Sequence, residues 1–437
     1  MSFFSIKSFT QKATAIIAAT LVILTIISCS DDPASPAPTN YSGENKVTYN
    51  VEYNENCIIL SGTQKDALIK VDSTSFTFDK DMLTEDLSPG KCFIISGEYM
   101  RKVTGVMEIG NRVYVETEDA KLTDVVKNGT ISWDFIPDFK IPATIEIGGK
   151  KIRGNKVQDD GYEFSYELDN WKYTLWFKPN GTAANGLPEI LVNFTVENSA
   201  VAGGKITAMF GAKGTTRLPR NSASINIQNS TLSGFSSGNK GMRSQLTLEY
   251  QAVFSEGGGQ AILSFPEITF KVPLQSLTAI PIPIPIDINF GLLFNTILNV
   301  PSVTAMASGK CQLTLDADNG FQFSGPTLDT KFTLNDDELK GMGWEVGDMS
   351  LSPAPVEVRH ELSSPRVSVE IAGNEILWGA LVFGTRSKLI IPSLCKAALD
   401  QVRIEGGYTM GMFGLTIAED SKLFWEKSIE YRTKECE

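Results

Sequence analysis

Side chains that could act as catalysts are scarce in this sequence, and its only histidine is the first to consider. His360 lies in Val356–Glu361, where apolar and polar residues alternate as they do along a β-strand. A Ser-His-Asp or Cys-His site would need this imidazole, but its strand setting favours a structural role. One histidine also excludes a histidine-rich metal centre. We therefore predict no catalytic residue of this kind, no metal and no cofactor.

Carboxylates are abundant, with 51 Asp and Glu residues in the chain. A glycosidase needs two of them about 5–10 Å apart. The candidates have no local signature that separates them from the other acids: Asp159, Asp160, Glu163, Asp316, Asp318, Asp336, Asp337, Glu338 and Glu345. A carbohydrate-active hydrolase that uses paired carboxylates is therefore kept as an alternative function.

One acidic segment resembles the start of a calcium-binding loop. Asp316-Ala317-Asp318-Asn319-Gly320 opens like D-x-D-x-D-G, but its glycine comes one position early and no Glu follows at the twelfth place. Asn-Gly is also the preferred tip of a tight hairpin. The segment is therefore predicted to be a hairpin turn rather than a calcium site.

The cysteines provide the remaining reactive side chains. Cys29 is treated separately below, and the other five leave at least one thiol unpaired. The two pairs that would join neighbouring elements are Cys57 with Cys92 and Cys395 with Cys436, so we predict disulfides there. No C-x-x-C spacing is present, which argues against a zinc ribbon or a thioredoxin-like site.

The N-terminal segment gives the most specific signal in the chain. Lys7 and Lys12 precede the uncharged apolar run Ala13–Ile27, which is followed by the small residue Ser28 and then by Cys29. This arrangement resembles the lipobox of bacterial lipoproteins. The resemblance implies that residues 1–28 are a signal peptide, cleaved before Cys29, and that the Cys29 thiol receives a diacylglycerol. The alternative is an ordinary secretory signal followed by an incidental cysteine.

The residues that follow predict how the chain is attached and displayed. Residues 29–40 are rich in Pro, Ala and Ser without large apolar residues, as in a disordered tether. Asp31 and Asp32 resemble the surface-export signal of Bacteroidetes lipoproteins, with a generic polar linker as the alternative. We therefore expect an outer membrane lipoprotein on the cell surface, held by its lipid anchor, because two or three acyl chains give stable attachment.

The net charge of the chain limits which classes of partner it can bind. The whole chain has 39 Lys and Arg residues, two of them within residues 1–28, so the mature chain has a net charge of −14. Nucleic acids and anionic headgroups attract basic surfaces. We therefore expect no nucleic-acid partner, and contact with the membrane only through the anchor.

The dominant hydrophobic period is two, which predicts an all-β fold of one or more β-sandwich or β-barrel-like domains. Strand-like alternation is separated by turn signals such as Asn128-Gly129 and Gly148-Gly149. Composition suggests an N-terminal β domain at residues 41–130 and a larger β-rich region at 131–437, with subdivisions near 200 and 326. Short helices are predicted only within Thr117–Lys127 and, near the C-terminus, at Pro392–Arg403.

Residues 87–130 resemble a module found in large secreted and surface proteins. The similarity lies in Met100–Val106, which fits x-R-K-V-T-x-V, and in Thr117–Val125, which fits T-E-x-A-x-L-x-D-V. That family is β-rich and of uncharacterised function. The resemblance therefore implies an extracellular β protein and assigns no catalytic residue.

The Pro- and Ile-rich stretch Gln275–Pro301 cannot be a membrane helix, because Pro281, Pro283 and Pro285 would break it. As an extended edge strand it would place its isoleucines on one face. The apolar residues in and after it either fill the core or form an apolar binding surface: Ile282, Ile284, Ile286, Leu292 and Phe294. The second possibility makes a carrier of an apolar ligand another alternative.

Aromatic residues on strand-like runs would suit stacking against sugars if they were exposed, although most such residues fill a core: Trp171, Trp176, Trp344 and Trp378. Taken together, the sequence favours a non-catalytic binding or adhesion module for a glycan or an extracellular protein. The hydrolase and the apolar carrier remain the alternatives. Facing acids beneath exposed tryptophans would favour the hydrolase, and an enclosed apolar cavity would favour the carrier.

Overall fold

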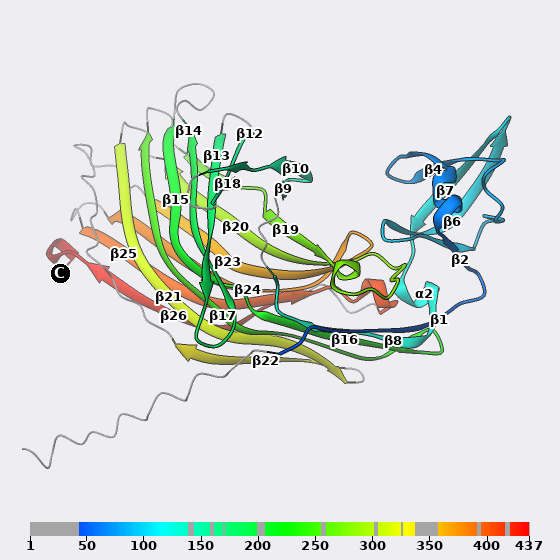
Figure 1. The fold of residues 1–437 in the computed structure, drawn as a ribbon. Helices are drawn as coiled ribbons and strands as arrows, with labels where there is room; N and C mark the ends of the chain where they lie inside the picture. The colour runs from blue at the N-terminus through cyan, green and yellow to red at the C-terminus, as the bar shows by residue number, and fades with distance from the viewer. Residues whose placement is uncertain are drawn as a thin grey trace, which may run out of the picture. The chain divides into compact units, whose positions relative to one another are not determined.

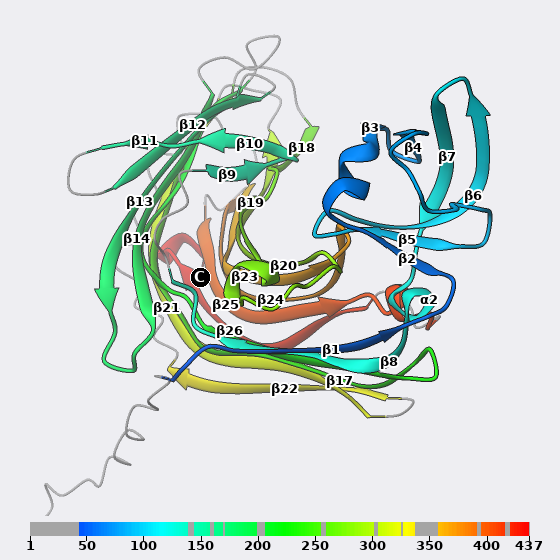
Figure 2. The ribbon, with the colours of Figure 1, turned by 45° about the vertical axis from the view of Figure 1, so that its right-hand side comes forward.

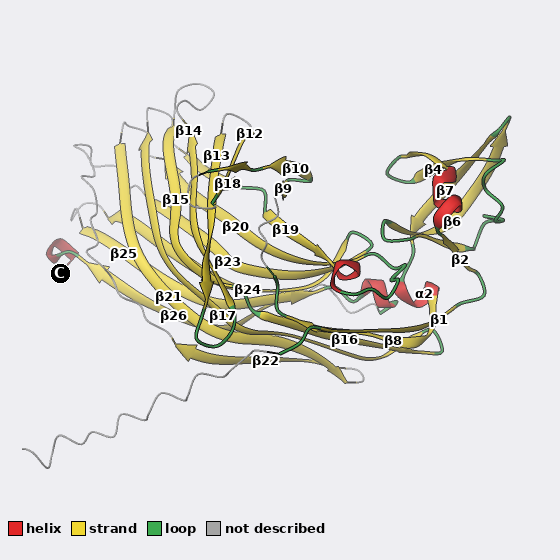
Figure 3. Ribbon diagram, in the orientation of Figure 1, coloured by secondary structure: helices red, strands yellow, loops and turns green. Residues whose placement is uncertain are grey.

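The computed structural model describes residues 43–138, 144–157, 161–168, 171–198, 206–254, 259–300, 305–324, 327–336, 357–390, 395–415 and 420–436. The chain divides into Met1–Asn40 and the compact unit Tyr41–Glu437. Cys29, the predicted signal peptide and the predicted tether lie outside the described residues. Within Tyr41–Glu437 the described residues form mainly antiparallel strands, so the fold is all-β (Figure 3).

The first sheet has eleven strands. Its long central strand is β17, which pairs along one edge with β21 and along the other with β16 and then β15. The eleven strands are β1 (Lys46–Tyr53), β8 (Val126–Phe135), β11 (Asn155–Lys156), β12 (Tyr162–Leu168), β13 (Trp171–Thr182), β14 (Pro188–Asn198), β15 (Ile206–Arg217), β16 (Arg220–Gln228), β17 (Thr231–Phe254), β21 (Ala305–Ser324) and β22 (Thr327–Asp336).

The second sheet has nine strands, and β20 has the corresponding role in it. It pairs with β18 and β19 on one edge and with β23 on the other. The nine strands are β9 (Thr144–Ile147), β10 (Lys150–Arg153), β18 (Gly259–Ser264), β19 (Ile268–Pro273), β20 (Ile286–Val300), β23 (Glu357–Ile371), β24 (Asn374–Ile390), β25 (Cys395–Tyr408) and β26 (Asp420–Arg432).

These two sheets pack face to face around one core. Phe194 of β14 stacks on Phe294 of β20 with ring centroids 3.9 Å apart, and Phe177 of β13 meets Phe270 of β19 at 4.8 Å. Along the strands buried and accessible residues alternate, which is the predicted period of two. Both sheets curve in the same sense, and the nine-stranded sheet lies on the inner side of the bend (Figure 2).

A smaller third sheet has six strands and its own core. It is formed by β2 (Cys57–Leu60), β3 (Leu68–Val71), β4 (Ser75–Asp79), β5 (Cys92–Ile95), β6 (Tyr99–Ile109) and β7 (Arg112–Asp119), with the 3₁₀ turn η1 (Gly62–Ala67) between β2 and β3. It is inserted between β1 and β8, which pair with each other in the eleven-stranded sheet (Figure 1).

The domain boundaries in the structure differ from those expected. Position 130 falls inside β8, so the N-terminal segment 41–130 contributes strands to two sheets. Positions 200 and 326 lie outside the described residues. The strands on either side of each position pair with one another, β14 with β15 and β21 with β22, so neither position separates two domains.

Helical structure is short where it occurs. The helix predicted within Thr117–Lys127 is α2 (Leu122–Val125). Besides η1, the other helical elements in the described residues are the 3₁₀ turns η3 (Leu274–Leu277), η4 (Gly411–Phe413) and η5 (Lys434–Cys436).

The predicted C-terminal helix at Pro392–Arg403 is wrong, because strand β25 begins at Cys395. Ala398 and Val402, an expected i, i+4 helix pair, are both buried on one face of β25. A spacing of four fits a strand face as well as a helix face, because four is also a multiple of two.

The predicted edge strand at Pro281–Pro285 is not formed, because β20 begins only at Ile286. Ile282, Ile284 and Ile286 are buried, whereas Ile280 is 46% exposed, and backbone carbonyls of the prolines accept hydrogen bonds. The carbonyl of Pro283 accepts from the Gly97 amide at 2.9 Å, and that of Pro285 accepts from the Ala372 amide at 2.8 Å. Proline lacks the amide donor but keeps this acceptor.

Candidate functional site

The apolar residues proposed from the sequence as a binding surface belong to the core. Ile282, Ile284, Ile286, Leu292 and Phe294 are all buried, and Leu292, the most accessible of them, is 5% exposed. The stacking of Phe294 on Phe194 shows what they do, which is to join the two sheets. Of the two possibilities that the sequence left open, these residues fill the core and do not form an apolar binding surface.

His360 lies in β23, as its strand-like setting predicted, and its side chain is completely buried. Its Nδ1 is 3.0 Å from the hydroxyl of Thr296, and its ring centroid is 5.2 Å from that of Phe210 and 5.8 Å from that of Phe294. No substrate could reach the imidazole without opening the core, so His360 has no place in a catalytic site.

Burial of His360 makes stability depend on pH. It lowers the pKa from 6.5 to about 4, so between those values the unfolded chain binds a proton that the folded chain does not. Stability contributed by neutral His360 is complete above pH 6.5 and falls as the pH falls, by about 2.5 kcal/mol at pH 4.5. We expect the difference in urea-unfolding free energy between pH 7 and pH 4.5 to shrink by about that amount in His360→Asn. If the pH 7 to pH 4.5 difference were the same in His360→Asn as in the parent chain, the lowered pKa of buried His360 would not be its cause.

The sequence also contains a serine motif whose spacing matches that of a hydrolase nucleophile, although its structure does not. Gly234-Phe235-Ser236-Ser237-Gly238 fits G-x-S-x-G, but it lies inside β17 instead of at a strand-to-helix turn. A nucleophile elbow requires that sharp turn to project the serine. The only histidine is enclosed elsewhere by Phe210 and Phe294, so this motif is part of the sheet.

The Asp316–Gly320 segment is neither a calcium loop nor a hairpin turn, since it lies in the middle of β21. Asp316 accepts a hydrogen bond from Arg217 at 3.1 Å, and Asp318 accepts one from the Gly241 amide at 2.7 Å. Gly320 is needed for strand packing, because a Cβ there would lie 2.5 Å from the Ser237 carbonyl oxygen. In the part of the chain that is described, no group of three His, Cys, Asp or Glu side chains could hold a metal.

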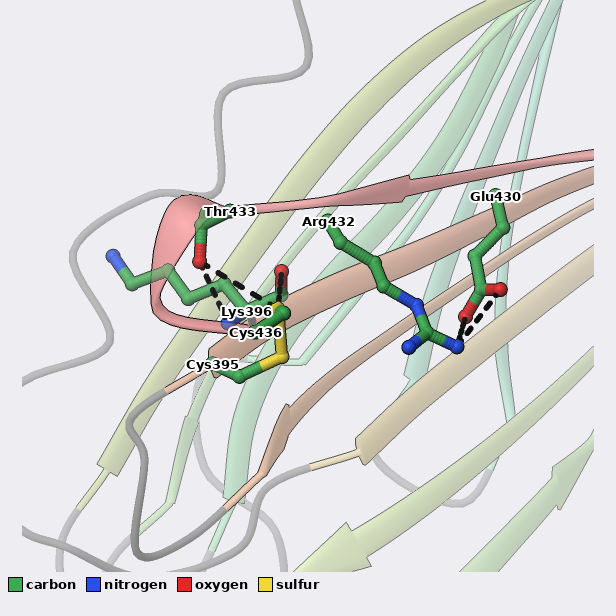
Figure 4. Close-up of a disulfide and its surroundings, with 6 residues drawn as sticks. All are labelled: Cys395, Lys396, Glu430, Arg432, Thr433 and Cys436. Atoms are coloured by element: carbon green, nitrogen blue, oxygen red, sulfur yellow. Dashed lines mark hydrogen bonds and ion pairs between the residues drawn. A yellow bond between two sulfur atoms is a disulfide. The ribbon is translucent and has the colours of Figure 1, made fainter.

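One of the two predicted disulfides is formed in the structure, and the other is not. Cys395 and Cys436 form a disulfide, as predicted, and it links the start of β25 to η5 (Figure 4). Cys57 and Cys92 lie opposite each other in the parallel β2–β5 pair but are free thiols in the structure, as is Cys311.

A polar groove lies on the outer face of the nine-stranded sheet, the face directed away from the core. Its cavity volume is about 440 Å³. The residues that line it come from four adjacent strands, β23 to β26: Arg359, Glu361, Gly384, Thr385, Arg386, Leu399, Gln401, Arg403, Glu405, Leu423 and Glu426. This is the sheet on the inner side of the bend (Figure 2).

Gly384 forms the floor of the groove. In the register it stands between Glu361 of β23 and Gln401 of β25. A Cβ at position 384 would lie 3.3 Å from Glu361 Cγ, so any larger residue would enter the space between these two long side chains. The cavity therefore depends on a glycine in the middle of a strand, where glycine is otherwise unfavourable.

Arg403 and Glu361 organise the walls. The Arg403 Nη1 donates to Glu361 Oε1 at 2.9 Å and to Gln401 Oε1 at 2.6 Å, while its Nε donates to Glu405 at 2.6 Å. Arg359 donates to the same Glu361 oxygen at 2.6 Å. Planar polar groups are thus held in fixed positions before any ligand arrives.

The Glu361 carboxylate is charged at neutral pH. Burial acts to raise the pKa of Glu361, but the hydrogen bonds and charges of Arg403 and Arg359 outweigh it, so the pKa is lowered overall. A general acid of a glycosidase needs the opposite shift. Glu361 is therefore suited to accepting hydrogen bonds and not to donating a proton.

A second polar cluster lies on the same face, further along β23 and β24. Arg366 is 8% exposed, and its Nη1 donates to Glu267 at 3.0 Å and to Glu375 at 2.8 Å. Its guanidinium carbon lies 4.9 Å from the ring centroid of Trp378. Burial raises the pKa of Glu267, although Arg366 opposes that shift.

The candidate stacking tryptophans divide between the two sheets. Trp171 is buried in the core, and half-buried Trp176 lies on the outer face of the eleven-stranded sheet. Trp344 lies outside the described residues. Half-buried Trp378 is the one that shares the face of the groove.

Comparison of the chain with protein-family models, with curated proteins and with solved structures finds no match. Among the residues that the structure describes, no helix is both long enough and apolar enough to cross a membrane. The assignment of a site therefore depends on geometry. Glu361, Gly384 and Arg403 were not singled out from the sequence, because their meeting depends on strand register, but alternating Arg and Glu at every second position of one strand was a visible signal.

Proposed function

We propose that this chain is a lipid-anchored protein, displayed outside the cytoplasm, that binds a glycan in the groove around Gly384. The anchor and the location rest on the N-terminal segment, where a charged region, an apolar run and Cys29 follow one another in the order of a lipobox. The proposal that the ligand is a glycan is based on the groove. Its volume of about 440 Å³ is within the range of small-ligand pockets.

The observation that carries the proposal is the fixed network of planar polar groups around Glu361. Sugar hydroxyls both donate and accept hydrogen bonds, so they need donors and acceptors side by side. Arg359 and Arg403 supply donors, whereas Glu361, Glu405 and Gln401 supply acceptors. Because these groups are already ordered by one another, less conformational entropy is lost when a ligand binds.

The other candidate functions fit this face less well. An apolar carrier loses its support, because the apolar residues offered for it are buried in the core. For a hydrolase, Glu267 and Glu375 are the carboxylates that share Arg366 with Trp378, but both accept hydrogen bonds from Arg366. A carboxyl held by a guanidinium is poorly placed to protonate a leaving group.

Glycan-array binding by the detergent-solubilised full chain tests the proposal. Gly384→Val fills the groove, and Ser428→Val is its matched control, since Ser428 is exposed and lies opposite Gln401 in β26 but does not line the groove. We expect Gly384→Val to weaken binding at least about tenfold and Ser428→Val to leave it within about twofold. Equal binding by both variants would refute the site. Capture of no glycan, with capture of an extracellular protein, would favour the adhesion alternative.

A further inference from the structure

We propose that Trp378 is a second subsite of the same face, on which a sugar ring stacks, and that the ligand is therefore a linear, neutral oligosaccharide. This inference rests on the proposed function and specifies the class of ligand.

The indole of Trp378 lies over a glycine of the neighbouring strand. Trp378 pairs with Gly407 of β25, and Gly407 pairs with Ser421 of β26. A Cβ at position 407 would lie 2.4 Å from Trp378 Nε1 and 2.8 Å from Cε2. The ring therefore occupies the space that a side chain at 407 would take, on the outer face of the sheet.

Polar residues line a small cavity beside this ring. A small cavity of about 100 Å³ is lined by Trp378, Tyr408, Thr409, Ser421 and Glu375, together with Ile376 and Leu377. The Ser421 hydroxyl and the Glu375 carboxylate can bond to sugar hydroxyls while the indole contacts the apolar face of the sugar, whereas Tyr408 is buried and packs on Phe321. An aromatic ring flanked by such groups is typical of a site that orients an amphipathic ligand.

Arg366 positions the tryptophan. Its guanidinium is 4.9 Å from the indole centroid and is itself held by Glu267 and Glu375. All of its charge is therefore engaged on the protein side. Arg366 is a positioning residue in this proposal and makes no contact with the sugar.

The distance between the two subsites sets the length of the ligand. Trp378 and Gly384 lie on the same strand and the same face, six residues apart, which corresponds to about 20 Å at about 3.3 Å per residue. The positions between them on this face are Val382 and Ala380, both without polar side chains. A monosaccharide or disaccharide is too short to occupy both ends, so the ligand must be an extended chain.

The charges favour a neutral chain. The arginines of the groove are paired with carboxylates: Arg359 and Arg403 with Glu361, and Arg386 with Glu357. An anionic sugar would meet Glu361, Glu405 and Glu426 while the arginines of the groove are already paired, and like charges repel. A neutral saccharide uses the same groups as hydrogen-bonding partners at no such cost.

Calorimetric titration of the detergent-solubilised full chain tests the subsite. The probes are cellohexaose, maltohexaose and mannohexaose, each with its disaccharide. We expect at least one hexaose to bind about tenfold more tightly than its disaccharide, and Trp378→Ala to remove that advantage while the disaccharide is unaffected. Trp378→Phe should keep part of it. Trp176→Ala is the matched control, because Trp176 also lies over a glycine, Gly161, but on the other sheet.

The outcomes separate the two proposals. If Gly384→Val abolishes hexaose binding and Trp378→Ala leaves it unchanged, the subsite is refuted and the groove stands. If neither variant weakens a hexaose that binds, both proposals fail. If no hexaose binds at millimolar concentration, the neutral linear chain is refuted, whatever the array shows. Circular dichroism of each variant checks that the sheets are intact, and release of reducing sugar from a hexaose would overturn a purely binding role.

Discussion

Removing the Cys395–Cys436 disulfide is expected to lower the free energy of unfolding by about 4 kcal/mol, because the bond closes a 41-residue separation and restricts the unfolded chain. The bond also ties η5, which follows β26, to the start of β25 (Figure 4). Of these two strands β26 lies at the end of its sheet and pairs with β25, so the disulfide secures the edge of the sheet.

Urea unfolding of Cys395→Ala/Cys436→Ala measures this effect, with Cys57→Ala as a control that removes a free and only partly buried thiol. We also expect weaker ligand binding in the double variant, since β25 and β26 supply Gln401, Arg403 and Glu426 to the groove. A double variant as stable as the parent chain under oxidising conditions would show that the bond does not constrain this edge.

Replacing Arg403 with Met is expected to lower the free energy of unfolding by about 3 kcal/mol. The change leaves Glu361 with one neighbouring cation, Arg359, and removes the hydrogen bonds that Arg403 donates to Glu405 and Gln401. The two side chains of the Arg403–Glu361 pair are 11% and 15% exposed, so water compensates the loss only in part. Arg432, which is 55% exposed and pairs with Glu430 at 3.0 Å, offers the control. Arg432→Met should change stability by less than about 1 kcal/mol.

A double-mutant cycle makes this prediction sharper. Glu361→Gln in the Arg403→Met background should restore part of the stability, because it removes the uncompensated charge. The loss in Arg403→Met should also diminish as the pH falls, since protonation of Glu361 has the same effect. Equal and small losses in Arg403→Met and Arg432→Met would mean that the groove network is not preorganised.

The all-β fold could be predicted from the sequence because its signal is local. Alternation in segments such as Arg366–Ile371 reports a strand without knowledge of its neighbours. The errors arose where one pattern is compatible with two structures. Ala398 and Val402 share a face in a helix and in a strand alike, and Gly320 serves close strand approach although Asn319-Gly320 is also a turn signal.

The groove could not be predicted, because it exists only through register. Glu361, Gly384 and Gln401 lie on three different strands and become neighbours when β23, β24 and β25 pair. The sequence around Gly384 does not indicate which side chains of the neighbouring strands lie beside this glycine. Trp378 was visible as a candidate for stacking, but its sheet face was not, because exposure depends on how the sheets pack.

Hydrogen–deuterium exchange of the full chain, with and without the glycan bound most strongly on the array, tests the central claim most directly. If the glycan binds in the groove, we expect slower exchange in peptides from β23 to β26 and unchanged exchange in β13 to β15 of the opposite sheet. Protection confined to the eleven-stranded or the six-stranded sheet would place the ligand elsewhere and contradict this claim.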